Sequence, residues 1–474
     1  MGNISAMGII YLVSCIVAML MTVNVVLKNR DTVKTLAWIL VFISLPGLGI
    51  ILYIFFGRDT RRKKIIGRRL LSQIKRGKLS DDAENQADVP PGYEPLVSFF
   101  RNSSSAWLMD ASEAKVFSSP KDFAHALFDE IESAREHIHI QFYIIENDEF
   151  GRGLREHLMA KARQGVEVRL IYDSVGCWGV DKEFFETMRC AGVYVESFLK
   201  VRFSLLTNKV NYRNHRKVVV IDGKVGFVGG CNIADRYLKG VRWGDWRDTM
   251  LLMRGAAVHG LQSSFLVDWY FASGSLVCGK RYFPSIPVMG EAGIPLQVVQ
   301  SNPVGDVRTI MTGFVKVLSS ARNYVYLQTP YFMPSEAFLL ALKSAAMSGV
   351  DVRLMIPERS DSRITDYASR SYLADIMEAG VKVYLYTAGF MHCKTLVSDD
   401  TISSVGSANL DFRSFYYNFE VSAFLYGREV AQQLKECFLE DMARCRQLAL
   451  TSFRERPLME RCKESVSRLF SPLL

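Results

Sequence analysis

One short pattern occurs twice in this chain, and it constrains the fold more than any other feature. The pattern is His, any residue, Lys, any four residues, Asp, and it begins at His215 and again at His392. An Asn follows each His at the same distance of 17 residues, at Asn232 and Asn409. A repeated motif in repeated surroundings indicates a duplicated unit. We therefore expect two similar halves that bring their motifs together in one site.

The sequence around the two motifs repeats as well. Residues 135–141 resemble residues 322–328, and both segments are typical of buried strands. In each half a helical segment, a strand, a second helical segment and another strand follow before the motif. Strands that alternate with helices of this length predict a layered α/β fold. We predict two pseudo-repeated α/β/α sandwich halves, 96–285 and 286–474, that share one active site.

The first 60 residues are predominantly apolar and predict a transmembrane helical hairpin. Residues 8–27 and 35–56 contain no Asp, Glu, Lys or Arg, and each has the roughly 20 residues that a helix needs to cross a bilayer. Lys and Arg are more numerous after the second stretch than in the short connector, so the rest of the chain is expected in the cytoplasm. A cleaved signal peptide is the alternative for the first stretch, but a charged n-region is missing.

Residues 61–95 predict a basic juxtamembrane helix followed by a linker. Ile66, Leu70 and Ile74 recur four residues apart among Lys and Arg, which favours a helix on an anionic membrane surface. A solvated linker helix is the alternative. The net charge of +9 also favours anionic partners. The nine cysteines have no metal-binding or disulfide spacing, which is typical of a reducing compartment.

The two motifs supply the groups that a phosphodiester exchange needs. One imidazole can attack phosphorus and form a covalent phosphohistidine, while the other protonates the leaving alcohol and deprotonates the incoming one. Lys and Asn side chains can neutralise the non-bridging oxygens. This chemistry requires no metal ion or other cofactor. The candidate catalytic residues are His215, Lys217, Asp222, His392, Lys394 and Asp399, and the candidate phosphate-binding residues are Asn232, Ser407 and Asn409.

Two pairs of carboxylates complete the candidate site. Asp222 and Asp399 belong to the motifs, but each ends its strand, where a turn or a structural hydrogen-bond acceptor is the simpler interpretation. A catalytic His also needs a carboxylate that holds its tautomer. Asp248 and Glu420 lie at similar distances after the two motifs and are the candidates for this role. A surface or structural role is the alternative for both.

The duplicated motif resembles the hallmark of the phospholipase D superfamily. Residues 229–237 (GGCNIADRY), 329–334 (TPYFMP) and 406–414 (GSANLDFRS), together with the apolar N-terminal region, resemble bacterial cardiolipin synthases over nearly the whole chain. The resemblance implies that two phosphatidylglycerol molecules are joined into cardiolipin, with release of glycerol, at the bacterial cytoplasmic membrane. By analogy with other superfamily members it favours His215 as the nucleophile, and His392 stays open.

A hydrolytic activity is the main alternative, because water and a lipid hydroxyl compete for the same phosphohistidine. A membrane-bound phospholipase D or a nuclease could use this two-histidine site, and a non-enzymatic basic scaffold is a third reading. The apolar N-terminal region favours lipid, so no nucleic acid partner is expected. Oligomeric state, acyl-chain preference and use of phosphatidylethanolamine as donor are not readable from the sequence. Four aromatic residues near the motifs fit either a lipid path or the core: Trp178, Trp243, Trp246 and Phe390.

Overall fold

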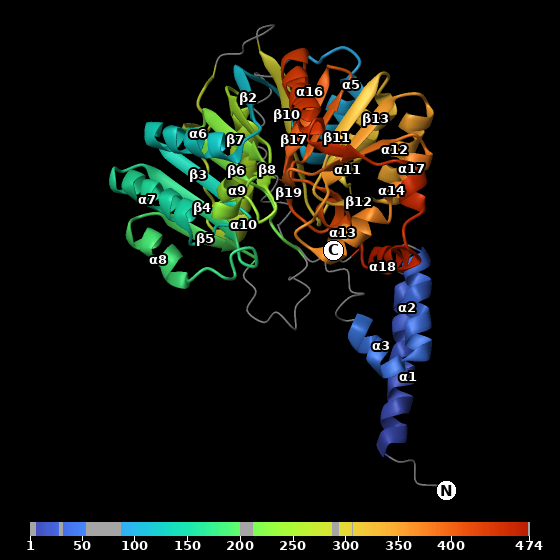
Figure 1. Ribbon diagram of the computed structural model, residues 1–474. Helices are drawn as coiled ribbons and strands as arrows, with labels where there is room; N and C mark the ends of the chain where they lie inside the picture. The colour runs from blue at the N-terminus through green and yellow to red at the C-terminus, as the bar shows by residue number, and fades with distance from the viewer. Residues whose placement is uncertain are drawn as a thin grey trace. The chain divides into compact units, whose positions relative to one another are not determined.

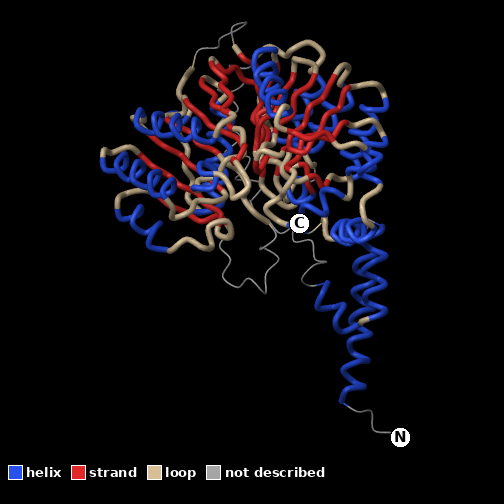
Figure 2. The backbone as a smooth tube through the Cα atoms, in the orientation of Figure 1, coloured by secondary structure: helices blue, strands red, loops and turns tan. Residues whose placement is uncertain are grey.

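The computed structural model describes residues 6–27, 32–53, 87–199, 212–286, 293–305 and 307–472. The chain separates into two compact units. The smaller unit contains the N-terminal helices, and the larger unit contains everything described from residue 87 onward, which we call the α/β body. Figure 1 shows the elements of both units, and Figure 2 distinguishes their helices from their strands.

The N-terminal unit is helical, as its apolar sequence predicts. Its small core includes Phe42 and Tyr53, whose ring centroids lie 5.3 Å apart in an edge-on arrangement. The stretch 35–56, expected as one helix, is divided into two, because the residue before a proline avoids the helical conformation. Leu45 accordingly has φ −141°, and Pro46 opens the next helix. The helices are α1 (Ala6–Leu27), α2 (Thr32–Ser44) and α3 (Pro46–Leu52).

Within the described ranges, no helix combines the length and the apolar composition that crossing a membrane requires. The predicted spanning hairpin is therefore not confirmed. The predicted basic helix and most of the linker lie outside the described residues, which resume at Ala87.

The first half of the α/β body is built around a seven-stranded sheet with the order β2-β9-β7-β6-β3-β4-β5. Strands β3, β4 and β5 are parallel, and β6 runs antiparallel beside β3. The elements are β2 (Glu113–Phe117), α6 (Pro120–Ser133), β3 (His137–Phe142), α7 (Glu149–Arg163), β4 (Glu167–Asp173), α8 (Lys182–Cys190), β5 (Tyr194–Phe198), β6 (Val218–Ile221), β7 (Val225–Gly229), α9 (Asp235–Lys239), β8 (Asp245–Arg247), β9 (Met250–Arg254) and α10 (Val258–Ser273), with the short 3₁₀ helix η5 (Lys280–Tyr282) after them.

The second half repeats this plan in a nine-stranded sheet with the order β1-β10-β19-β17-β16-β11-β13-β14-β20. Strands β11, β13 and β14 are parallel, and β16 runs antiparallel beside β11. The elements from the linker and the second half are α5 (Glu94–Ser104), β1 (Leu108–Ala111), β10 (Ile294–Ser301), α11 (Thr309–Ser320), β11 (Tyr324–Gln328), β12 (Phe332–Met333), α12 (Glu336–Met347), β13 (Asp351–Pro357), α13 (Arg363–Arg370), α14 (Leu373–Glu378), β14 (Lys382–Tyr386), β15 (Gly389–Met391), β16 (Thr395–Ser398), β17 (Ile402–Gly406), β18 (Leu410–Asp411), α15 (Phe412–Tyr416), β19 (Glu420–Tyr426), α16 (Arg428–Met442), β20 (Cys445–Gln447), α17 (Leu450–Arg454) and α18 (Leu458–Leu469).

The duplicated α/β fold predicted from the sequence is confirmed, and one boundary differs. Residues 96–111 were assigned to the first half, but β1 pairs with β10 of the second sheet, with Leu108 opposite Gln297. Helix α5 likewise contributes Phe100 to the core of the second half. The hydrophobic pattern of a short strand identifies it as a strand, whereas the sheet that it joins depends on contacts far away in the sequence.

A shared core joins the two sheets. Val220 and Leu251 of the first half belong to the same buried cluster as Val397 and Val421 of the second. Each half also has its own core on the other face of its sheet, under α6, α7 and α8 in the first half and under α11, α12 and α14 in the second. The inner faces of the sheets therefore pack against one another, and this packing sets the halves in position.

Each motif Asp anchors the end of its strand to a neighbouring strand. Asp222 has φ 51°, and its carboxylate accepts hydrogen bonds from the backbone N–H groups of Arg135, Glu136 and His137 at 2.8–2.9 Å. Asp399 has φ 53° and accepts in the same way from residues 322–324, at 2.7–2.9 Å. Both residues are among the candidate catalytic residues, with a structural hydrogen-bond acceptor as the simpler interpretation, and these contacts support the structural role. The two Asp residues lie beyond the far ends of β6 and β16, away from the His and Lys of the same motif.

We predict that Asp222→Ala destabilises the fold and spares the chemistry. Loss of a carboxylate that accepts three backbone hydrogen bonds should lower the free energy of unfolding by about 2–4 kcal/mol. Thermal and denaturant unfolding in detergent would measure this loss, with turnover normalised to the folded fraction. Asp129→Ala is the matched control, because Asp129 is exposed on α6. A fully folded Asp222→Ala protein without turnover would return this Asp to the catalytic set.

Candidate active site

The two motifs lie at the same kind of position in their halves. In the first sheet Val218 pairs with Gln141, the penultimate residue of β3. In the second sheet Thr395 pairs with Gln328, the last residue of β11. The His and Lys that precede β6 and β16 therefore lie at the carboxyl ends of the parallel strands, which is the usual edge for ligand binding in α/β sheets.

The segments that carry the histidines pair with the opposite half. Strand β8 pairs in parallel with β15, so that Arg247 lies opposite Met391, and the backbone N–H of His392 donates to the carbonyl oxygen of Arg247 at 2.7 Å. In the same way Asn214 bridges to Phe419, and the backbone N–H of His215 donates to its carbonyl oxygen at 3.0 Å. Each His thus lies beside the residue that precedes the supporting carboxylate of the other half.

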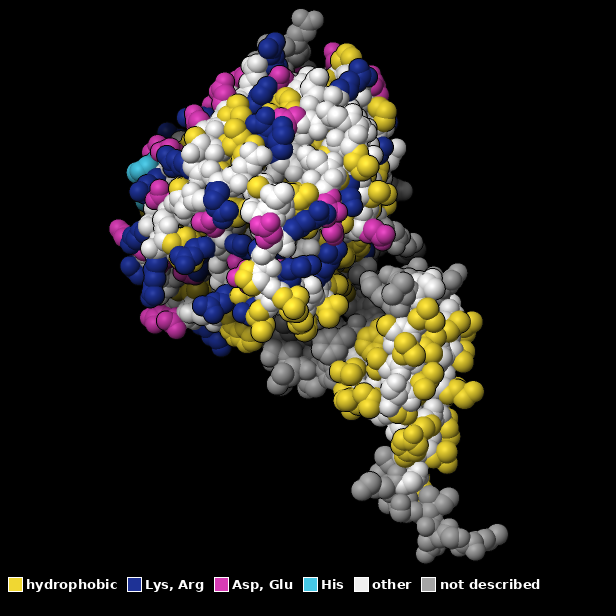
Figure 3. Space-filling view, turned by 45° about the vertical axis from the view of Figure 1, so that its right-hand side comes forward, with side chains coloured by type: hydrophobic (Ala, Val, Ile, Leu, Met, Phe, Trp, Pro, Cys, Tyr) yellow, Lys and Arg dark blue, Asp and Glu magenta, His cyan; other side chains and the backbone are white. Residues whose placement is uncertain are grey.

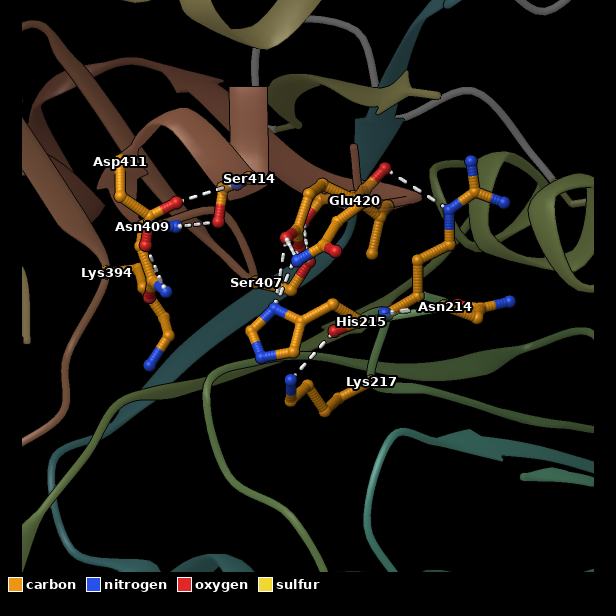
Figure 4. A network of polar contacts seen from close by, with 12 residues as sticks. Asn214, His215, Lys217, Lys394, Ser407, Asn409, Asp411, Ser414 and Glu420 are labelled. Atoms are coloured by element: carbon orange, nitrogen blue, oxygen red, sulfur yellow. Dashed lines mark hydrogen bonds and ion pairs between the residues drawn. The ribbon is translucent and has the colours of Figure 1, made fainter. Parts of the chain in front are cut away.

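As a result of this pairing, each motif His contacts a carboxylate that belongs to the opposite half. Nδ1 of His215 lies 3.0 and 3.1 Å from the two carboxylate oxygens of Glu420, as Figure 4 shows. Nδ1 of His392 lies 2.6 Å from Oδ2 of Asp248. A carboxylate accepts the Nδ1 hydrogen, which leaves the lone pair on Nε2. The structure brings both predicted carboxylates to histidines, each to the His of the opposite half.

Two buried lysines complete the charges of the site. Nζ of Lys217 donates to the carbonyl oxygen of His215 at 2.7 Å, and Nζ of Lys394 lies 2.9 Å from Nδ1 of His392. Burial lowers the pKa of both ammonium groups, that of Lys217 well below its usual range. Figure 4 shows Lys217 and Lys394, which come from different halves, on two sides of the His215 ring.

The pKa shifts connect the two motifs electrostatically. Burial lowers the pKa of His215, and the charge of Lys394 from the other half contributes to the shift. Burial also lowers the pKa of His392, to about 3, with contributions from Lys394 and Lys217. Both imidazoles are therefore neutral near pH 7. Charges of one half that act on the His of the other half indicate one shared site.

The supporting carboxylates remain ionised despite their burial. Desolvation by itself raises the pKa of Glu420, but His215 and Lys217 outweigh it and lower the pKa below its usual value. For Asp248 desolvation is outweighed by Lys394 and His392. Lys217 and Lys394 lie beside these two carboxylates and lower their pKa values, and the same lysine side chains can stabilise an anionic phosphodiester.

The two Asn residues among the predicted phosphate-binding residues have donor hydrogens in the site, whereas Ser407 is bound to Glu420. Asn232 accepts from the backbone N–H of Ile144 at 3.1 Å, and Nδ2 of Asn409 donates to Asp411 at 2.9 Å. An amide nitrogen carries two hydrogens, so the bond to Asp411 uses only one of the two donors of Asn409. Ser407 differs from the prediction, because its hydroxyl donates to Glu420 and accepts from the backbone N–H of Val421. It holds the supporting carboxylate.

Further residues that sequence reasoning missed support the same groups. Nδ2 of Asn418 donates to Oε1 of Glu420 at 3.1 Å, and Tyr143 lies edge-on to the His215 ring at 5.1 Å. Gly230 makes room for Asp248, because a Cβ there would overlap its carboxylate. Asn418 could have been found from its place two residues before Glu420, whereas Tyr143 has no signal in the sequence.

The four aromatic residues near the motifs have different locations. Trp246 and Phe390 are buried and pack against the ring of His392, at 5.2 and 5.7 Å between centroids. Trp178 and Trp243 are exposed, with 68% and 36% of their surface accessible. The core interpretation therefore holds for the first pair, and the second pair remains available to a lipid surface.

Two buried arginines that the sequence analysis did not identify contact the backbone of Glu420 and Asp248, the residues that carry the supporting carboxylates. Arg216, which lies between the His and the Lys of the first motif, donates to Asp268 at 2.7 Å and to the carbonyl oxygen of Glu420 at 3.2 Å. Arg247 donates to Asp441 at 3.0 Å and to the carbonyl oxygen of Asp248 at 2.7 Å. In both cases a guanidinium joins a buried helix carboxylate to the backbone of the residue whose side chain contacts a motif His.

The two arginines reach equivalent places from different sequence positions. Arg216 stands where the second motif has Cys393, and its guanidinium lies 5.6 Å from the ring centre of Phe419. Arg247 stands in the position that Phe419 holds before the other carboxylate, and it contacts Cys393 at 3.3 Å. The first half therefore supplies both cations and the second half both smaller or apolar partners, and the motif position and the position before the carboxylate are exchanged between the two histidine–carboxylate contacts.

Two similar halves that each supply a His and a Lys to one buried site define an enzyme of the phospholipase D type. A family model described as cardiolipin synthase, PLD-like domain, matches residues 127–259 and 314–442. A second model, described as phospholipase D-nuclease N-terminal, matches residues 15–58. The chain belongs to the cardiolipin synthase family.

Individual relatives agree with this placement. The chain is 42% identical over 470 residues to a cardiolipin synthase of Geobacillus thermodenitrificans (strain NG80-2), covering 98% of this chain and 93% of the relative. It is 39% identical over 473 residues to the major cardiolipin synthase ClsA of Bacillus subtilis (strain 168), covering 97% and 98%. The fold resembles a crystal structure of phosphatidylserine synthase from Haemophilus influenzae Rd KW20, with a TM-score of 0.64 at 13% identity, covering 81% of this chain and 100% of that one.

We predict that acid destabilises the protein through its site histidines. The folded pKa of His392 is about 3, whereas an unfolded His titrates near about 6.5. Its contribution to stability is therefore complete above the unfolded pKa and is lost as pH falls toward the folded one. Melting curves between about pH 4 and pH 8 should show Tm falling with acid, and His392→Asn should flatten that slope. The same slope in this variant as in an exposed control, His125→Asn, would contradict the prediction.

We also predict that an Arg at position 393 can replace the guanidinium of Arg247. Arg247→Phe leaves the Asp441 carboxylate buried without its cation, which typically costs about 3–5 kcal/mol, and it should lower kcat. Adding Cys393→Arg recreates around His392 and Asp248 the arrangement that Arg216 and Phe419 have around His215 and Glu420, and it should recover a substantial part of both stability and kcat. Cys393→Arg alone crowds two cations together and serves as the comparison. A double variant no better than Arg247→Phe would refute the equivalence of the two positions.

Proposed function

We propose that this chain transfers the phosphatidyl group of one phosphatidylglycerol to a second, giving cardiolipin and glycerol through a covalent phosphohistidine. The observation that carries the proposal is the crossed pair of contacts, His215 with Glu420 and His392 with Asp248. Each carboxylate keeps a proton on Nδ1, so both Nε2 atoms have lone pairs for chemistry at phosphorus. Family membership supplies the substrate class.

In the first half-reaction Nε2 of His215 attacks phosphorus, and the bond between phosphorus and the glycerol oxygen breaks. His392 donates a proton to the departing alkoxide, so that free glycerol leaves and a phosphatidyl-histidine remains. A bound phosphodiester supplies negative charge that raises the pKa of His392 from its low value. Lys217 and Lys394 neutralise the non-bridging oxygens, with Asn232 and Asn409 as further donors.

In the second half-reaction a hydroxyl of another phosphatidylglycerol replaces glycerol. His392 takes the hydroxyl proton, the oxygen attacks phosphorus, and the bond to Nε2 of His215 breaks. Cardiolipin leaves and both imidazoles return to their starting states. One phosphodiester replaces another, so the exchange is nearly isoenergetic and is driven by lipid excess and glycerol removal. The roles of the two histidines could be exchanged without changing this balance.

Attachment to the bacterial cytoplasmic membrane is part of the proposal, with the α/β body on the cytoplasmic side. Helix α1 has no acidic residue in its first turn and no basic residue in its last. Several of its large apolar side chains are more than half exposed, including Tyr11, Leu12, Met19 and Leu20. A continuous apolar surface of this kind marks a site of contact with lipid or protein. Figure 3 shows the apolar side chains that cover the N-terminal unit.

The decisive assay uses purified full-length protein and phosphatidylglycerol in mixed micelles, without added nucleotide. Cardiolipin and glycerol should appear in equal amounts, and His215→Ala and His392→Ala should each lower turnover by at least about a thousandfold while lipid binding persists. Phosphatidic acid as the main product would support the phospholipase D alternative. Turnover near that of the unmodified protein in either variant would refute the two-histidine mechanism.

A trapping experiment assigns the nucleophile. The substrate is phosphatidylglycerol that carries a label in its phosphate, and the protein is denatured rapidly at alkaline pH. The label should remain on the protein, because phosphohistidine is stable in base, and it should be released by acid. Peptide mapping should find the label on His215. Label on His392 would exchange the roles of the two histidines and leave the overall reaction unchanged.

A further inference from the structure

Helix α18 is oriented with its polar side toward the protein and its apolar side away from it. Its buried residues are Glu464 and Ser467. Glu464 forms an ion pair with Arg456, and Arg468 donates to the carbonyl oxygen of Ser371 at 3.1 Å. A helix on a soluble domain normally buries its apolar stripe instead. Hydrogen bonds and ion pairs hold this helix in place, so its apolar side chains are not needed for attachment.

The apolar stripe of α18 is continuous and exposed. Leu458, Cys462, Val466 and Leu469 follow one another at intervals of three or four residues, which puts them on one face. Met459 and Phe470 widen this face, and the five apolar residues other than Cys462 are between 49% and 77% exposed. Exposed apolar surface of this extent indicates a contact that the isolated body does not provide.

The rim of the stripe is basic. Arg461 and Lys463 are exposed on its two sides, in the first and second turns of the helix. An apolar face with Lys and Arg beside it is the pattern of a helix that lies in the headgroup region of an anionic membrane. A protein partner would need complementary acidic groups around an apolar centre, and a second copy would bring the same basic rim against itself.

The location of α18 agrees with a membrane contact at the active site. It packs on α13, which follows the carboxyl end of β13, and Arg468 lies over the ring of Tyr372 at 4.1 Å. The catalytic histidines lie at the carboxyl ends of β3 and β11, the same edge of the sheets. Exposed Trp178 follows β4 at this edge of the first half. Figure 1 shows α18 beside α13, and Figure 3 shows apolar side chains gathered along the lower edge of the body.

We propose that the outer face of α18 lies in the headgroup region of an anionic bilayer and holds the active-site edge of the α/β body against the membrane. The contact would supply lipid to the site without full extraction into water. The inference depends on the proposed function only for the identity of that lipid. It assigns to the C-terminal helix a membrane contact separate from the N-terminal unit.

A fluorescent probe on the stripe tests the contact without reference to catalysis. Cys462 is exposed, as are Cys190 and Cys278. Full-length protein with Ser at 190 and 278 would carry an environment-sensitive dye on Cys462 and be placed in phosphatidylglycerol vesicles. We expect blue-shifted emission and at least a twofold loss of intensity when the vesicles contain lipids with a quencher near the headgroup.

Two matched proteins accompany this measurement. A dye on Cys190, with Ser at 278 and 462, should remain unquenched, because Cys190 ends α8 at the opposite edge of the first sheet. Protein with Ser at all three positions measures background labelling. Emission from Cys462 typical of water would overturn the proposal. A blue shift that lipid quenchers leave unchanged would put a second protein copy on this face and would overturn it as well.

Substitutions on the stripe connect the contact to turnover. Val466→Glu with Leu469→Glu should raise the apparent KM for vesicle phosphatidylglycerol by roughly tenfold, because two apolar side chains no longer enter the membrane. Turnover of a short-chain, monomeric phosphatidylglycerol should be unchanged. Met347→Glu is the control, because Met347 is 75% exposed, close to the 77% of Leu469, but lies at the opposite edge of its sheet.

The outcomes separate this proposal from the proposed function. An unchanged KM for vesicle lipid in the double variant, together with normal cardiolipin synthesis, would refute the membrane contact of α18 alone. A protein that makes no cardiolipin but shows lipid quenching at Cys462 would retain the contact and lose the function.

Discussion

The crossed contacts between each His and the carboxylate of the other half are the interaction on which the rest of this structure depends. Glu420 holds His215, and Asp248 holds His392, through buried contacts of 2.6–3.1 Å. Neither half contains a supported imidazole without the other. The packing of the two sheets and the pairing of β8 with β15 bring these groups together, so fold stability and site geometry depend on the same interface.

The ionised side chains buried at the site each need a partner of opposite charge. The two carboxylates are balanced by Lys217 and Lys394, and their backbones are held by Arg216 and Arg247, whose own charges are paired with Asp268 and Asp441. Ionised groups buried in this way are stabilised only while all their partners remain. A site built like this is preorganised for a phosphodiester, since its donors need little reorganisation when the anion arrives.

The two halves resemble one another more in their backbone than in the side chains around the site. Strand order and the Asp222 and Asp399 turns repeat almost unchanged, because backbone hydrogen bonds leave few alternatives. The arginines exchange positions, and Gly230 stands where the second half has Ser407, since only the place of the charge matters. Helix α18 lies at the end of the second half, and among the described residues the first half has no matching helix with an exposed apolar face.

Residue spacing and residue type are local properties, and they were enough to predict the duplicated α/β halves, the two histidines, the two lysines and the carboxylates Asp248 and Glu420. The helix break at Pro46 is also a local effect, which the residue before the proline could have indicated. Tertiary packing sets the rest: these carboxylates cross between the halves, Ser407 binds Glu420, and β1 joins the second sheet. The same packing places the carboxylates of Asp222 and Asp399 on backbone amides far from the site. The pairing of strands and segments that are far apart in the sequence decides these outcomes, and such pairing leaves no periodic signal in the chain.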